Sequence, residues 1–106
     1  AHTTALELGE KINTRLIFDG FAALAADEGE YPRAARLSGA ADSLGTTIGY
    51  SVEPAEQIFR DAYLTKLRAA MTDDEFEVEH ATGRQLTTDQ ARKLAYPRSS
   101  VSNYSR

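Results

Sequence analysis

Two helix-start signals in the second half of the chain constrain its fold more than any other feature. Residues 72–75 are Thr-Asp-Asp-Glu, and residues 87–90 are Thr-Thr-Asp-Gln. In such a capping box the threonine hydroxyl accepts a hydrogen bond from the N–H three residues later, while the glutamate or glutamine accepts one from the threonine N–H. Each box is also flanked by the two apolar residues of a hydrophobic staple. These signals predict short helices over 73–82 and 88–96, separated by Gly83.

The earlier part of the chain carries apolar side chains at the three- and four-residue spacing of helices. One helix is predicted over about 4–28, either continuous or divided at Gly9. We favour a break or kink there, because glycine costs a helix about 1 kcal/mol relative to alanine. Gly29 is placed to end this helix and Pro32 to begin the next. The apolar face predicted for the first helix consists of Ile12, Leu16, Phe18, Phe21, Ala22, Leu24 and Ala25.

Two further helices are predicted before the first capping box. The second helix contains a run of small residues at 38–41, which permits close approach by a neighbouring helix. Gly49 interrupts the pattern, and Pro54 begins the third helix. The stripe predicted for the second helix is Leu37, Ala41, Leu44 and Ile48. The face predicted for the third helix is Ala55, Phe59, Ala62, Tyr63, Leu67 and Ala70.

We therefore predict an all-α fold of about five helices arranged as antiparallel hairpins, because the alternating pattern of strands is missing. Residues 1–96 form the expected helical domain, with a repeat-like unit at about 15–48 and capping helices at about 54–96. Residues 97–106 form a polar, serine-rich tail. The packing core expected for the repeat unit is Phe21, Ala34, Leu37, Ala41 and Leu44.

Part of the chain resembles a tetratricopeptide repeat, a motif of about 34 residues that forms two helices. Gly29 and Tyr31 match its glycine turn and aromatic residue, and Ala34 and Ala41 match the small residues of its second helix. The positions of the repeat's first helix are occupied by Phe18, Phe21, Ala22 and Ala25. The last of these, like Ser38, replaces an aromatic residue that is common in the motif. The resemblance implies a right-handed helical repeat with one recognisable unit.

Residues 33–44 and 83–91, followed by Ala95, are similar to a region of the large ATP-binding transcriptional regulators of bacteria, chiefly actinobacteria. Some members of that group carry a LuxR-type DNA-binding domain, and others an adenylate cyclase domain. The resemblance covers about 5–96 and implies the C-terminal end of the helical-repeat region that follows the ATPase core. Because neither a phosphate loop nor a helix-turn-helix occurs in this sequence, ATP binding and DNA binding are not carried over.

Composition narrows the class of protein. Apolar residues make up 42% and charged residues 26%, as in folded globular domains. The apolar runs are much shorter than the roughly 20 residues needed to cross a bilayer. Cysteine is absent, which excludes disulfides, thiolate zinc sites and a cysteine nucleophile, and is consistent with a reducing cytoplasm. Residues 1–4 lack the features of a signal peptide and are consistent with a boundary inside a longer protein. We expect a cytoplasmic protein without a membrane segment.

The residue patterns do not predict catalytic chemistry. Glu77 and His80 have the Glu-x-x-His spacing of di-iron bundles, but the second copy that such a site needs is missing. The acids at 73–79 lack the ligand pattern of a calcium loop and are explained by capping and the helix dipole. Ser38 lies in a predicted helix without a complete nucleophile-elbow motif. We predict no catalytic, cofactor or metal site, and that the chain is not an enzyme.

Binding is the function class that remains. We expect a non-catalytic module for protein interaction or intramolecular regulation within a larger regulator. Its candidate interaction surface is Arg33, Arg36, Arg92 and Lys93. One alternative is an accessory nucleic-acid-binding element using the basic end at 84–106, although the net charge of −4 disfavours it. Another is a small-molecule sensor pocket between the repeat helices.

Self-association is a further expectation. A repeat array that is cut exposes the apolar face that the missing neighbour would cover. We therefore expect the fragment to form a homodimer through its first helix, with a contribution from the tail. The residues expected at this contact are Leu6, Leu8, Ile12, Leu16, Val101 and Tyr104.

Overall fold

The computed structural model describes residues 4–49 and 53–95, and within them it contains five helices and no strand. The helices are α1 (Ala5–Asp27), α2 (Tyr31–Ile48), α3 (Pro54–Ala70), α4 (Asp73–Arg84) and α5 (Thr88–Ala95). For this part of the chain, the prediction of an all-α fold of about five helices is confirmed. The predicted tail at 97–106 lies outside the described residues.

The two predicted capping boxes are present. At 72–75 the Glu75 N–H donates to the Thr72 hydroxyl at 3.1 Å, and the Thr72 N–H donates to the Glu75 carboxylate at 2.9 Å. The box at 87–90 has the same two bonds, at 3.1 and 2.9 Å. A third box at 4–7, which was not predicted, begins α1 with bonds of 3.0 and 2.9 Å. Each box satisfies backbone N–H groups that a helix start leaves without partners.

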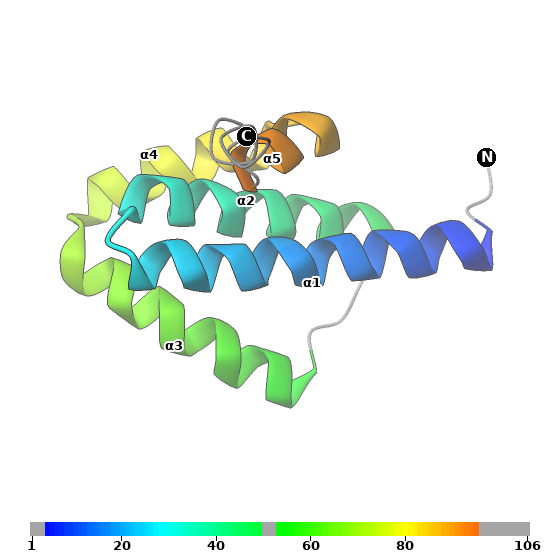
Figure 1. Ribbon diagram of the computed structural model, residues 1–106, viewed down its shortest axis with the longest axis horizontal. Coiled ribbons are helices and arrows are strands. Elements are labelled where there is room, and N and C mark those ends of the chain that lie inside the picture. Colours follow the sequence, from blue (N-terminus) through cyan, green and yellow to red (C-terminus); the bar gives the residue numbers. More distant parts are fainter. Residues whose placement is uncertain (1–3, 50–52, 96–106) are drawn as a thin grey trace, which may run out of the picture.

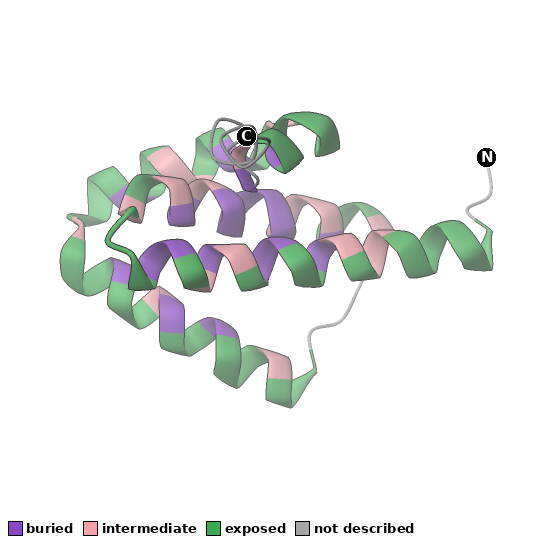
Figure 2. Cartoon of the chain, viewed as in Figure 1, coloured by how far each residue is buried: buried purple, intermediate pink, exposed green. Residues whose placement is uncertain are grey.

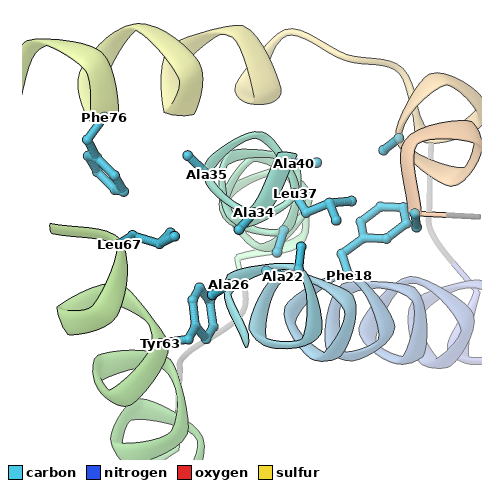
Figure 3. Packing of buried hydrophobic residues seen from close by; sticks show 14 residues of the cluster. Phe18, Ala22, Ala26, Ala34, Ala35, Leu37, Ala40, Tyr63, Leu67 and Phe76 are labelled. Carbon is cyan, nitrogen blue, oxygen red and sulfur yellow. The ribbon is translucent and has the colours of Figure 1, made fainter. Parts of the chain in front are cut away.

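The other four helices of the described residues all contact α2. Figure 1 shows α1 and α2 as an antiparallel pair, with α4 packed along α2. Helix α3 contacts both members of this pair, through hydrogen bonds to α1 and to α2. The view along α2 in Figure 3 shows α1, α3, α4 and α5 arranged around it. The first turns of α1 extend beyond the other helices and are exposed (Figure 2). The buried core therefore lies between α2 and its neighbours.

The expected break at Gly9 is wrong, because α1 runs through this residue without interruption. The glycine lies on an exposed part of the helix, and a Cβ added there would meet no atom within 4 Å. A glycine in a helix carries a cost of about 1 kcal/mol, which reduces stability without ending the helix. The capping box at 4–7 and the packed half of α1 hold the helix on both sides of Gly9.

Gly83 does not separate two helices as predicted, because it lies inside α4. A Cβ at this position would overlap the backbone carbonyl of Arg36 in α2. In the same way, a Cβ at Gly39 of α2 would overlap the carbonyl of His80 in α4. The two glycines thus bring the backbones of α2 and α4 into direct contact, which any side chain would prevent.

The core is built largely from alanine. Figure 3 shows Phe18, Leu37, Tyr63, Leu67 and Phe76 filling the spaces around the alanines of α1 and α2. Of the five residues predicted as packing core, Ala34, Leu37 and Ala41 are fully buried. Phe21 and Leu44 are half-buried at the margin of the core. Small side chains at the centre allow the helices to lie close together.

The predicted faces of α1 and α3 are partly wrong. On α1, Arg15 and Asp19 are buried, while Leu16 and Leu24 of the predicted face are exposed. The face expected on α3 is also rotated, because Phe59 is exposed, as are the three alanines of that face, and Arg60 is buried. Apolar residues occur all around α1, so helical spacing fits more than one face.

Candidate functional site

A buried network of charged and polar side chains joins the first four helices. At its centre is Arg60 of α3, whose side chain is almost completely buried. Its Nε donates to Asp19 Oδ1 of α1 at 3.1 Å, and its Nη1 donates to Asp42 Oδ1 of α2 at 2.6 Å. Its Nη2 donates to the Ser38 hydroxyl at 3.1 Å. A buried guanidinium needs such partners, because burying a charge without them is strongly unfavourable.

Tyr63, one turn after Arg60, completes the inner part of this network. Its hydroxyl donates to Asp19 Oδ1 at 2.6 Å and lies 3.1 Å from the Ser38 hydroxyl. Burial raises the pKa of Asp19, although Arg60 opposes the shift. Burial and the nearby charge of Asp19 also raise the pKa of the Tyr63 phenol. The phenol is therefore held in its neutral, donating form.

The network reaches the surface at Asp42 and His80. His80 Nε2 of α4 lies 2.8 Å from Asp42 Oδ2. Burial acts to raise the pKa of Asp42, but hydrogen bonds from His80 and Arg60 outweigh it and lower the pKa to about 2. Because the ionised carboxylate only accepts hydrogen bonds, Nε2 carries the proton. The imidazole also stacks on Phe76, with ring centroids 5.4 Å apart.

Arg15 extends the network along α1. Its Nη1 forms an ion pair with Glu56 of α3 and lies 3.7 Å from Asp19 Oδ2. Gly45 of α2 makes room for this side chain, since a Cβ there would lie 2.7 Å from Arg15 Nε. These ion pairs and hydrogen bonds hold α3 against the α1–α2 pair. They form a structural connection between the helices.

Sequence reasoning missed this network, because arginine and aspartate are rarely buried. A signal was present in the helical spacing. Arg15 and Asp19 are four residues apart on α1, and Arg60 and Tyr63 are three residues apart on α3. Residues three or four positions apart lie on the same face of a helix, so each of these two pairs can be buried together.

The basic residues predicted as an interaction surface come from α2 and α5. They are Arg33, Arg36, Arg92 and Lys93. Arg33 donates to the Leu94 carbonyl at 3.2 Å, and Arg36 donates to Glu79 at 2.5 Å. The two basic residues of α5 are exposed, and Arg92 pairs with an acid in its own helix. The two arginines of α2 thus bind α5 and α4 within the chain.

The outer side of α1 carries an apolar stripe made of Ile17, Gly20, Phe21 and Leu24. These residues line a shallow surface groove. Ile17 is 44% exposed and Leu24 is 47% exposed, and Phe21 is half-buried beside them. A Cβ at Gly20 would meet no atom within 4 Å, so the centre of the stripe is open. With its other face in the core, α1 is apolar on two sides, which is typical of a helix that is covered on both.

The residues expected at a homodimer contact are spread around the beginning of α1. Leu6 is 74% exposed, Leu8 and Leu16 are also exposed, and Ile12 is half-buried. Val101 and Tyr104 lie outside the described residues. The exposed leucines do not form one continuous face with each other, and the stripe at 17–24 is the more compact apolar surface.

Of the remaining sequence candidates, Ser38 lies in the buried network. Glu77 is exposed, while His80 is directed to Asp42. Within residues 4–49 and 53–95, no three side chains of ligand type gather where they could hold a metal ion. A pocket of about 230 Å³ lies between α1, α2 and α5, and Phe18, Leu44 and Leu86 are among its lining residues.

Comparisons with protein-family models, with curated proteins and with solved structures give no match. Among the described helices, none combines the length and the apolar character that crossing a membrane would require. The candidate site therefore rests on the geometry of the chain itself, and the α1 stripe is its most distinctive exposed feature.

Proposed function

We propose that the chain is a non-catalytic helical module that binds another protein segment within a larger regulatory protein. The observation that carries this proposal is the exposure of the apolar side chains of Ile17 and Leu24 on either side of Gly20. When a second helix packs on such a face, apolar surface is removed from water, and this stabilises the contact. The segment that covers this face belongs either to a partner protein or to another part of a longer chain. In the second case the contact would be intramolecular and could regulate the parent protein.

Two features of the sequence and fold support a repeat-like context. The antiparallel α1–α2 pair with α4 packed on α2 is compatible with the tetratricopeptide-like unit expected at 15–48. In repeat proteins each unit is covered by its neighbours. The similarity of 33–44 and 83–91 to bacterial ATP-binding regulators supports the same setting.

The two alternative functions gain no comparable support. A sensor site would use the pocket between α1, α2 and α5, but ligand sites usually measure roughly 300–1,000 Å³ and this pocket about 230 Å³. A nucleic-acid site would use the basic end at 84–106, of which the structure describes residues 84–95.

Site-specific photo-crosslinking in the protein's native cells tests the proposal. A photoreactive amino acid at position 17 should crosslink to one defined polypeptide segment, identified by mass spectrometry. Leu24→Glu should abolish that crosslink, because it places a charge on the apolar contact. The same probe at exposed position 65 of α3 is the control. Equal crosslinking from both positions, or a product unaffected by Leu24→Glu, would contradict binding through the stripe.

A further inference from the structure

We propose that the surface of α1 and α2 beneath α5 is a second binding site, and that α5 is a lid which a partner helix displaces from it. This surface, the α5 seat, contains Phe18 of α1 with Ala40 and Leu44 of α2. The partner is a helix that resembles α5 but carries a larger apolar residue in place of Ala91. The seat is separate from the α1 stripe, so the proposal goes beyond the function proposed above.

Helix α5 is held by few contacts. It has eight residues, and it buries completely only the small side chains of Ala91 and Ala95. In the described part of the chain, a single hydrogen bond joins α5 to another helix, and the buried charged network connects the other four helices. A helix of this length is unstable by itself in water. Elements with so little buried surface open at a lower free energy than the whole domain.

The space beneath α5 shows which chemistry fits the seat. A pocket of about 230 Å³ remains between α5 and the α1–α2 pair, and Phe18, Leu44 and Ala91 are among its lining residues. Figure 3 shows the Phe18 ring directed from α1 towards α5. A leucine in place of Ala91 would extend into this space and remove more apolar surface from water than the alanine does. A partner helix of this kind would therefore bind the seat more strongly than α5.

Arg33 of α2 gives the seat a donor for the end of a helix. Its Nη1 donates to the carbonyl of Leu94 in the last turn of α5 at 3.2 Å. Its Nε is held by the Glu30 carboxylate at 2.9 Å, which keeps the side chain in place independently of α5. Because the last carbonyls of any helix lack partners within that helix, Arg33 can bind an incoming helix in the same way.

Two synthetic peptides test the chemistry of the partner. Both have the sequence of residues 85–95, and they differ only in carrying alanine or leucine at position 91. Binding to the isotope-labelled 106-residue chain is followed by nuclear magnetic resonance. The leucine peptide should bind about tenfold more tightly and shift the signals of Phe18 and Leu44, because its side chain fills the pocket. Equal affinities, or shifts confined to other residues, would overturn the proposed site.

Two variants of the chain test the lid. Ala91→Glu places a charge in the buried contact and should unseat α5, so that the leucine peptide binds at least about tenfold more tightly than to the unsubstituted chain. Gln90→Glu makes the same change of charge at an exposed position and can keep the capping bond to Thr87, so it should leave the affinity unchanged. If the two variants bound the peptide equally, α5 would not compete for the seat.

Hydrogen exchange of the unsubstituted chain tests the lid without relying on the folding of Ala91→Glu. The amides of residues 92–95 should exchange at least about 100-fold faster than those of residues 37–41 in α2. Ala91→Gly should accelerate exchange in α5 and leave α2 unchanged, because it weakens only the lid. Equal exchange of the two helices would show that α5 opens only when the whole chain unfolds, and would overturn the lid.

The substitution Leu24→Glu separates this proposal from the function proposed for the stripe. Leu24 lines the groove of the stripe and not the pocket beneath α5, so the substitution should leave peptide binding unchanged. If it abolished binding, the peptides would be assigned to the stripe, and the seat would be overturned while the stripe remained a binding surface. A dimer of the unsubstituted chain that Ala91→Glu dissociates would assign the seat to α5 of a second copy and overturn the proposed partner.

Discussion

Arg60 of α3 and Asp19 of α1 face each other in the interior, with Arg60 Nε 3.1 Å from Asp19 Oδ1 and both side chains almost completely buried. Apart from these polar contacts, α3 buries mainly Tyr63 and Leu67. Its position on the α1–α2 pair therefore involves charge pairing as well as apolar packing. Breaking one partner of such a network leaves the other partners buried without compensation.

Arg60→Met should destabilise the chain by about 3–5 kcal/mol, because it leaves Asp19 and Asp42 without their shared cation. Urea unfolding followed by circular dichroism measures the change. Arg92→Met removes an exposed arginine of α5 and should alter stability by roughly 0.5 kcal/mol or less. Equal stability of the two variants would show that the buried network contributes little.

The acid stability of the chain should depend on Asp42. Its pKa is lowered from 3.8 to about 2 in the folded state, so its contribution is present above about pH 4 and is lost as the pH falls towards 2. Allowing for solvent screening at this partly exposed group, the contribution is on the order of 1–2 kcal/mol. Asp42→Asn should therefore flatten the loss of stability between about pH 4 and pH 2, measured by urea unfolding at each pH.

The contribution of Asp19 to stability should change with pH in the opposite direction. Because its pKa is raised on folding, its contribution to stability is greatest at low pH and declines as the pH rises through the folded-state value. The loss of stability between about pH 4 and pH 2 is therefore assigned to Asp42 and not to Asp19. If the stability of Asp42→Asn depended on pH in the same way as that of the unsubstituted chain, this assignment would be contradicted.

Tyr63 should titrate above the ordinary range of a tyrosine phenol. Its pKa is raised by burial and by the charge of Asp19, so its phenolate should form only at higher pH. Ultraviolet absorbance of phenolate during an alkaline titration measures this. In Tyr63→Phe the late step should be missing, and a late step that persists would assign it to another tyrosine.

Two glycine-to-alanine substitutions should change stability in opposite directions. Gly83→Ala should destabilise the chain by about 1–3 kcal/mol, because the new Cβ overlaps the Arg36 carbonyl and forces α2 and α4 apart. Gly9→Ala should stabilise it by about 0.5–1 kcal/mol, since the methyl group meets open space in an exposed helix. Thermal and urea unfolding report both values. Destabilisation by both substitutions would indicate that α1 is not regular at Gly9.

Local sequence determined the helices of this protein. The boxes at 72–75 and 87–90 begin α4 and α5, and Gly49, which adopts a left-handed conformation at φ +67°, ends α2. Hydrogen bonds between a cap and the first turn involve only neighbouring residues. Such signals can therefore be identified without knowledge of the fold.

The tertiary structure decided which face of each helix is buried and what the glycines do. Arg15 and Asp19 point inward, and Leu24 points outward, because partners on α3 complete the charges and no described helix covers the outer side of α1. Gly83 continues a helix because α2 lies against it. Helical spacing specifies which residues share a face. Whether that face meets solvent, a neighbouring backbone or an opposite charge depends on residues far away in sequence, and only the folded arrangement brings them together.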